Sequence, residues 1–147
     1  MQEIVNMLSM DLRYMSHSVE NNTITIRIES IKPTSVCSYC GVESNFVHSV
    51  YERKAQDLPI QGKKVILLIK RRKFFCLNKE CTHKTYAEQF NFIKTNARKT
   101  NRLQAEILEV SLTQSSISAS KYLRKNIADV GKSTICNLLK KRDVNNE

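Results

Sequence analysis

The first part of the chain alternates hydrophobic and polar residues, as half-buried strands do. In TITIRIESI, residues 23–31, isoleucine occupies every second position from 24 to 28, which is the period of a strand with one buried face. Asn21 and Asn22 form a turn signal before it, so the pattern predicts a hairpin over about 13–31. The apolar residues of 3–10 predict a short helix before this hairpin.

Two further strands are predicted in the middle of the chain. Residues 46–54 and 63–75 are rich in Val, Ile, Tyr and Phe, which are enriched in strands. Pro59 and Gly62 lie between the two segments and mark a connection. We therefore expect a second hairpin, in which these two strands are joined by a turn.

From about residue 97 the hydrophobic period becomes helical. Leu103, Ile107 and Val110 repeat at spacings of four and three, which predicts an amphipathic helix. Thr100 or Asn101 is the expected N-cap of this helix.

Two shorter helices are predicted after it, over residues 117–126 and 133–143. Ser133 is a suitable N-cap for the second, and a short connection containing Gly131 precedes it. Two helices joined by a short turn fit a helix-turn-helix, in which the second helix lies in the major groove of DNA. The same pattern also fits any small helical bundle.

Four of the five cysteines form two pairs at the spacing of metal ligands. Cys37 and Cys40 form a C-x2-C motif followed by Gly41, and Cys76 and Cys81 form a C-x4-C motif. The central hairpin would bring the pairs together, and four thiolates in a tetrahedron suit one structural Zn²⁺. Four free, buried cysteines are the alternative interpretation.

The other candidates for metal ligands or catalysis are weaker. His83 lies two residues after Cys81 and competes as the fourth ligand, but four thiols already complete a tetrahedral shell. Cys136 lies in a predicted helix, and we interpret it as a packed side chain. The sequence contains no carboxylate pair, nucleophile elbow or phosphate-binding glycine loop. We therefore expect no catalytic residues and no enzymatic activity.

Together these patterns predict an α+β protein with three parts. Residues 1–36 would form a helix and hairpin that pack on the zinc module. Residues 37–92 would form a small β-rich zinc-knuckle module, and residues 93–147 an all-α helix-turn-helix domain.

The charge of the chain points to a polyanionic partner. Lys and Arg number 24 against 14 Asp and Glu, a net charge of +10. Residues 1–36 carry a net charge of −1, and residues 37–147 carry +11. Nucleic acid is the commonest polyanion, and anionic membrane is its rival. The apolar run at 65–69 is much shorter than the roughly 20 residues that span a bilayer.

The candidate DNA contacts lie in basic clusters on the predicted strands and helices. A solvated surface explains any one cluster, but several clusters on one basic segment favour contact with phosphates. Asn137 is the candidate for reading a base, and the lysines around it are candidates for contacting phosphates. The complete set is Arg53, Lys70, Arg71, Arg72, Lys73, Arg98, Lys99, Arg102, Lys132, Thr134, Asn137, Lys140 and Lys141.

The central segment also resembles a known family. The order C-x2-C-G, then VHSVYERKAQDLPIQGKKVILLIKRRKFFC, a later cysteine and TYAEQF resembles the N-terminal region of ISL-three family transposases, which move insertion sequences. The resemblance implies a zinc-binding module whose ligands are Cys37, Cys40, Cys76 and Cys81. It also implies a following helix-turn-helix that recognises the terminal inverted repeats of a mobile element. Family members continue into a catalytic Asp-Asp-Glu domain, and this chain stops before it.

We therefore expect a zinc-dependent, sequence-specific double-stranded DNA-binding protein derived from a transposase, without catalysis of its own. The expected location is the bacterial cytoplasm, in association with the nucleoid. The alternative is a regulatory module that pairs with full-length transposase, or with itself, through the near-neutral hairpin 13–31. Neither interpretation involves a membrane or a small-molecule substrate.

Overall fold

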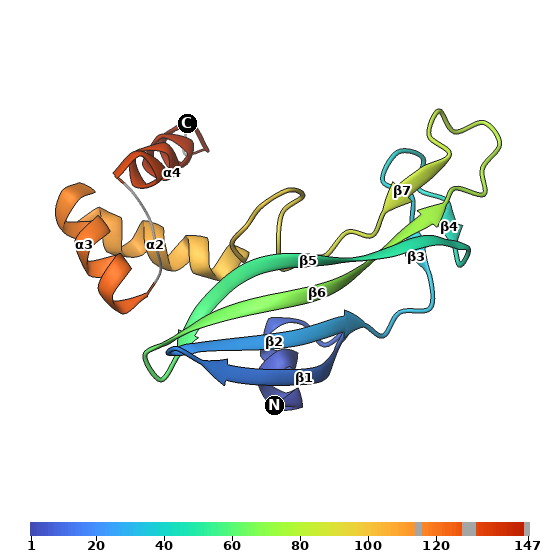
Figure 1. Cartoon of the computed structure of the whole chain (residues 1–147). Coiled ribbons are helices and arrows are strands. Elements are labelled where there is room, and N and C mark those ends of the chain that lie inside the picture. Colours follow the sequence, from blue (N-terminus) through green and yellow to red (C-terminus); the bar gives the residue numbers. More distant parts are fainter. Residues whose placement is uncertain (114–115, 128–131, 146–147) are drawn as a thin grey trace.

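In the computed structural model, a long sheet carries a small β-module at one end and three helices at the other (Figure 1). The structure describes residues 1–113, 116–127 and 132–145. The helices are α1 (Gln2–Leu8), α2 (Asn101–Thr113), α3 (Ser116–Asn126) and α4 (Lys132–Asn145). The strands are β1 (Leu12–Glu20), β2 (Thr23–Ser30), β3 (Ser35–Val36), β4 (Glu43–Ser44), β5 (Val47–Ile60), β6 (Lys63–Phe75) and β7 (Thr85–Ala87).

The main sheet joins the two predicted hairpins. Its strand order is β1-β2-β6-β5, and β7 pairs with β6 beyond this path. β1 and β2 are antiparallel, as are β5 and β6, so both hairpins are confirmed. β2 and β6 run parallel, with Ile26 beside Leu67. The sequence pattern did not predict this pairing, because local periodicity says nothing about which distant strands become neighbours.

One face of the sheet is buried and the other is open. α1 and the segment before α2 cover the buried face. The predicted N-terminal helix is therefore confirmed, and its Val5 lies in the core. On β6, the alternation of strand residues leaves Ile66 and Leu68 half-buried and Lys70 exposed on the opposite face. The buried core contains Val5, Leu12, Ile26, Ile28, Ala55, Val65, Leu67, Ile69, Phe92 and Ile93.

The first strand of the central hairpin is longer than the sequence pattern predicted, whereas Gly62 marks the turn as expected. The turn lies at Gln61 and Gly62, which have positive φ angles of 50° and 74°. β5 continues through Pro59 to Ile60, although proline is unfavourable inside regular sheets. Pro59 falls where the pairing register shifts, between Asp57 and Ile60, so the regular ladder is interrupted there.

The three predicted C-terminal helices are confirmed and pack around a second core. Thr100 is the N-cap of α2, because its Oγ1 accepts a hydrogen bond from the Leu103 N–H at 3.4 Å. Gly131, in the predicted connection, lies outside the described residues, and the helix-turn-helix stays a prediction. Within the described ranges, no helix has the length and hydrophobicity needed to cross a membrane. This core contains Leu103, Ile107, Ala119, Leu123 and Ile135.

Candidate metal centre

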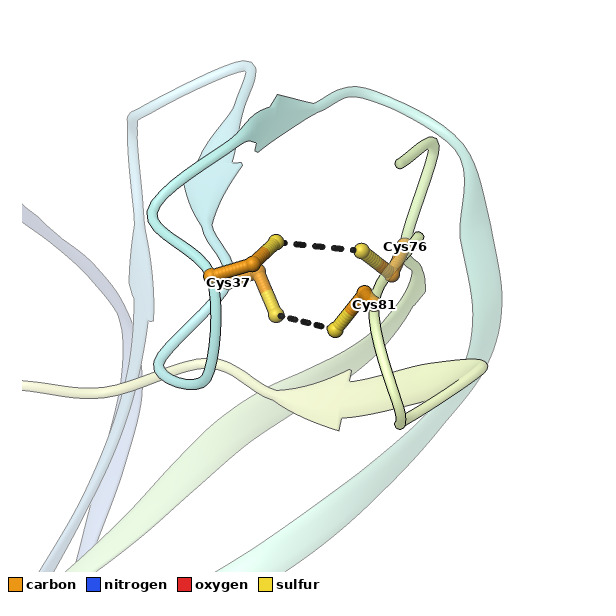
Figure 2. A group of neighbouring side chains, drawn as sticks. Cys37, Cys76 and Cys81 are labelled. Carbon is orange, nitrogen blue, oxygen red and sulfur yellow. Dashed lines mark hydrogen bonds between the residues drawn. The ribbon is translucent and has the colours of Figure 1, made fainter. Parts of the chain in front are cut away.

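The four paired cysteines meet at the end of β6 (Figure 2). Cys37 and Cys40 lie between β3 and β4, whereas Cys76 and Cys81 lie between β6 and β7. The Sγ atoms of Cys37 and Cys81 are 4.0 Å apart, and those of Cys40 and Cys76 are 3.5 Å apart. All four Sγ atoms lie within 4.8 Å of one another, so the two predicted pairs form one cluster.

These distances fit one tetrahedral zinc ion. Zn–S bonds of about 2.3 Å in a tetrahedron place the sulfurs about 3.8 Å apart. The two measured Sγ–Sγ distances of 3.5 and 4.0 Å lie on either side of this value. The cluster is therefore a site for one structural Zn²⁺, as predicted. Because four thiolates complete the shell, no coordination position is left for water or a substrate.

A tight turn brings the first pair of sulfurs together. Gly41 has a φ angle of +80°, a conformation that side chains disfavour. Its N–H donates a hydrogen bond to the Cys37 carbonyl at 2.8 Å, and the Cys37 N–H donates to the Val42 carbonyl at 3.0 Å. The turn therefore explains why a glycine follows Cys40.

Ionisation of the Cys40 thiol opposes ionisation of the Cys76 thiol. A hydrogen bond from the Val42 backbone lowers the pKa of the Cys40 thiol to about 6. Although a hydrogen bond from the Asn78 backbone lowers the pKa of Cys76, burial and the neighbouring thiols raise it to about 12. A divalent cation removes this opposition, because it stabilises all four thiolates together.

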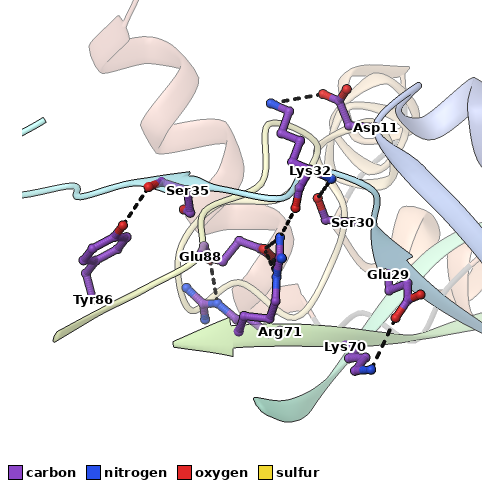
Figure 3. A network of polar contacts seen from close by, with 10 residues as sticks. Asp11, Glu29, Ser30, Lys32, Ser35, Lys70, Arg71, Tyr86 and Glu88 are labelled. Atoms are coloured by element: carbon purple, nitrogen blue, oxygen red, sulfur yellow. Dashed lines mark hydrogen bonds and ion pairs between the residues drawn. The ribbon is translucent and has the colours of Figure 1, made fainter. Parts of the chain in front are cut away.

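Little hydrophobic core lies beneath the cysteines. The buried residues of this module are Cys37, Phe74 and Tyr86. The two aromatic rings stack with their centroids 5.8 Å apart. The Tyr86 hydroxyl donates to the Ser35 carbonyl at 2.6 Å, which links β7 to β3 (Figure 3). Because so small a core supplies little hydrophobic stabilisation, the metal has to hold the module together.

Two arginines of β6 hold the segments that carry the cysteines. Arg71 is 5% exposed, and its Nε donates to the Glu88 carbonyl at 2.8 Å (Figure 3). The Arg72 Nη2 donates to the Glu88 carboxylate and to the Lys32 carbonyl, both at 2.7 Å. These bonds fasten the chain before Cys37 and the chain after β7 to β6. Sequence reasoning missed this role, because nothing local to the arginines identifies partners so distant in the chain.

Two other cations proposed as DNA contacts also have partners within the fold. The Arg53 guanidinium donates to two backbone carbonyls of segment 94–97, at 2.7 and 2.8 Å. The Lys70 Nζ lies 3.4 Å from the Glu29 carboxylate. Contact of these residues with DNA, like that of Arg71 and Arg72, stays a prediction.

Arg102 lies at the junction between the sheet and the helices. Its Nε donates to the Asp57 carboxylate at 2.8 Å, and Thr100 donates to the same carboxylate at 2.7 Å. The hydrogen bonds that Arg102 donates to the Asp57 carboxylate raise the pKa of Arg102. Because Asp57 is in β5 and is 3% exposed, this contact anchors the start of α2 on the sheet.

The remaining candidate contacts lie in two places. Arg98 is exposed and Lys99 half-buried in the segment before α2, whereas Thr134, Asn137 and Lys140 are exposed on α4. Lys73 is half-buried on β6. The side chains of Lys132 and Lys141 lie outside those that the structure describes.

The histidines and the fifth cysteine lie outside the metal cluster. His83 stacks on Tyr39 with ring centroids 3.5 Å apart, and His48 meets the edge of Phe75. Cys136 is half-buried on α4. Among the described residues, the metal-ligand group consists of the four paired cysteines alone.

Comparison with known proteins supports this centre. Residues 33–81 match the family described as the zinc-finger of transposase IS204/IS1001/IS1096/IS1165. No curated protein and no solved structure matches the chain. The matched segment ends at Cys81 and includes all four ligands and the β5–β6 hairpin, but not helices α2 to α4. The match therefore supports a zinc-binding region of the ISL-three transposase type within this chain.

Proposed function

We propose that this protein binds double-stranded DNA at the terminal inverted repeats of a mobile element. It would act as the DNA-binding portion of a transposase. The observation that carries the proposal is the four-cysteine centre within a segment similar to the zinc finger of transposases. The net charge of +10 supplies the attraction to phosphates that such binding needs.

The surface of α4 supports its use as the helix that reads DNA. Ile135 is buried in the helical core, and Leu138 and Leu139 pack against it. Thr134 and Asn137 are exposed, three residues apart, and so are neighbours on the surface of the helix. An asparagine in the major groove can bond adenine through two hydrogen bonds, which gives Asn137 a role in choosing the sequence.

Selection from a pool of randomised duplexes tests this proposal with the zinc-loaded full chain. One enriched sequence is expected, and salt should weaken binding to it. Asn137→Ala should weaken binding to that sequence about tenfold, with little effect on other duplexes. Asn91→Ala changes an exposed asparagine away from α4 and is the matched control.

Two results would contradict the proposal at different levels. A pool without an enriched sequence would remove sequence-specific recognition but leave general DNA binding. Absence of binding to any duplex at low salt would remove DNA binding altogether.

The edge of the main sheet favours a second candidate function. β1 is the last strand of the sheet, and Met15 and Val19 are exposed on it. An open edge strand can pair with a strand of another chain. The chain would then pair with full-length transposase, or with itself, and inhibit transposition. Sedimentation of the DNA-free protein tests whether the chain pairs with itself. A monomer at every protein concentration would exclude self-pairing.

A further inference from the structure

A basic pocket lies on the open face of the main sheet, where β5 and β6 meet the segment before α2. Its volume is about 470 Å³, within the range of sites for small ligands. Its cationic lining residues are Lys54, Lys64, Arg98 and Lys99. Arg98 and Lys99 belong to the set of DNA contacts predicted from the sequence, whereas Lys54 and Lys64 belong to its basic clusters but not to that set.

The fold builds this pocket from three separate segments. Lys54 and Gln56 share one face of β5, because side chains alternate along a strand, and Gln56 pairs with Ile66 of β6. The Gln56 N–H donates to the Arg98 carbonyl at 2.8 Å, and the Gln56 carbonyl accepts from the Thr100 N–H at 3.0 Å. The segment before α2 thus extends the sheet beside β5 and brings its two cations to Lys54.

The charges of Lys54, Arg98 and Lys99 are not balanced by neighbouring acids among the described residues. Lys54, Arg98 and Lys99 form no ion pair among the described residues, and the lining residues include no carboxylate there. The nearest acids on β5 have other partners: Glu52 binds Arg27 at 2.5 Å, and Asp57 binds Arg102. Because like charges repel at short range, an anion in the pocket would be strongly favoured.

A buried amide supplies a second, independent sign of a ligand. Gln56 lines the pocket and is 9% exposed. Its Nε2 has no hydrogen-bond partner among the described residues. Buried donors in proteins are nearly always paired, so this group requires an acceptor, and the surrounding cations specify that the acceptor is negative.

We propose that this pocket binds a phosphate group of the DNA backbone. Lys54, Arg98 and Lys99 neutralise the phosphate, and a small shift of the buried Gln56 side chain lets its Nε2 donate to one of the phosphate oxygens. The identity of the phosphate as part of DNA rests on the proposed function. Arg98 and Lys99 directly precede α2, so a phosphate held here fixes the sheet and the helices on one duplex. Phosphate contacts position a protein on DNA, whereas base contacts select the sequence.

Salt dependence of binding to a duplex of random sequence tests the site. The double variant Lys54→Gln/Lys99→Gln should bind about tenfold more weakly, and its slope of log K against log salt should be shallower by about 1. The matched control Lys79→Gln/Lys94→Gln removes the same charge from exposed lysines outside the pocket and should keep the wild-type slope. Gln56→Glu should also weaken binding, and its urea unfolding, followed by circular dichroism, checks that the sheet and helices remain folded.

Titration with inorganic phosphate separates this inference from the proposed function. If the wild type binds DNA but the double variant and its control have equal slopes, the pocket proposal is wrong and the function stands. If the wild type binds no DNA, the proposed function fails. In that case, phosphate binding by the wild type that is lost in the double variant would support an anion site that does not bind DNA. Absence of phosphate binding by the wild type would overturn the anion site as well.

Discussion

The two ends of the main sheet are held together by different forces. At the metal end, the buried residues are Cys37, Phe74 and Tyr86, and four sulfurs meet in one cluster. At the helical end, five apolar side chains from three helices form an ordinary hydrophobic core. The metal end depends on zinc for its stability, whereas the helical end depends on packing. Each end should therefore respond to a perturbation that leaves the other intact.

Removal of zinc by a chelator should have the largest effect. Structural zinc sites contribute on the order of 10 kcal/mol of apparent binding free energy near neutral pH. Amide hydrogen exchange should rise sharply in residues 35–46 and 76–88, and zinc should reverse the change. The helical signal in circular dichroism should persist, because α2 to α4 pack around their own core.

The same experiment tests how much of the predicted module 37–92, which includes β5 and β6, depends on zinc. β2 and β6 pair in the main sheet, away from the cysteines, so exchange there should change little. Loss of protection across β5 and β6 but not β2 would support the predicted division at 36, whereas loss across β2 as well would contradict it. Loss of the helical signal as well would show that the whole chain unfolds as one unit.

Truncation of the helical core should have the next largest effect. Ile107 is completely buried between α2 and its neighbouring helices. Ile107→Ala should destabilise the helices by about 2–5 kcal/mol, because it removes buried methyl groups and leaves a cavity. Urea unfolding followed by circular dichroism measures this loss. Ala105→Gly, at an exposed position of the same helix, controls for helix propensity at about 1 kcal/mol.

Zinc content should distinguish the two ends in this variant. One bound zinc per chain is expected after Ile107→Ala, because β3, β4 and β7, which flank the cysteines, lie at the opposite end of the sheet from the helices (Figure 1). Loss of zinc would show that the helical core supports the metal site, and would contradict independent stabilisation of the two ends.

The metal end was easier to predict from the sequence than the helical end. Two cysteine pairs are chemically specific, because few other arrangements explain their spacing, and the structure brings Cys37, Cys40, Cys76 and Cys81 together. The helices were also predicted, from their period. Periodicity identifies a packed face but not what the opposite face binds, so α4 as a recognition helix stays a proposal.

The parts that the sequence did not reveal depend on distant pairings. Local periodicity does not reveal that β2 pairs with β6, because it says nothing about distant neighbours. The short strands β3, β4 and β7 have only two or three residues, which is too few to show a period. The Arg72 contact with Glu88 was also not visible, because the two residues are distant in the chain. The residue types around Arg72 indicated a basic surface, whereas its contact with Glu88 indicates a structural role in holding β6 to the chain after β7.

Replacement of Arg72 tests this structural role. Arg72→Ala should destabilise the metal end by about 3 kcal/mol, because the Glu88 side chain, which is 5% exposed, loses its ionic partner. Zinc affinity, measured by competition with a chelator, should fall as well. Lys73→Ala changes the neighbouring cation and should cost less than about 1 kcal/mol.

Arg72→Lys separates a structural role from a DNA contact. A lysine keeps the charge but cannot bond the Glu88 carboxylate and the Lys32 carbonyl as Arg72 does. Stability should therefore recover only in part. Full recovery of DNA binding together with unchanged stability in Arg72→Ala would instead assign this residue to phosphate contact.

Replacement of His83 should have the smallest effect. The ring stacks on Tyr39 at the exposed side of the knuckle, and loss of an exposed aromatic pair costs about 1 kcal/mol or less. His83→Ala should therefore keep one zinc per chain, as measured by elemental analysis. Cys81→Ser, two residues away, should lose it, because a hydroxyl is a poor replacement for a thiolate ligand of zinc. If His83→Ala lost zinc and Cys81→Ser kept it, three cysteines and a histidine would be the ligands, and the four-sulfur geometry would not describe the bound state.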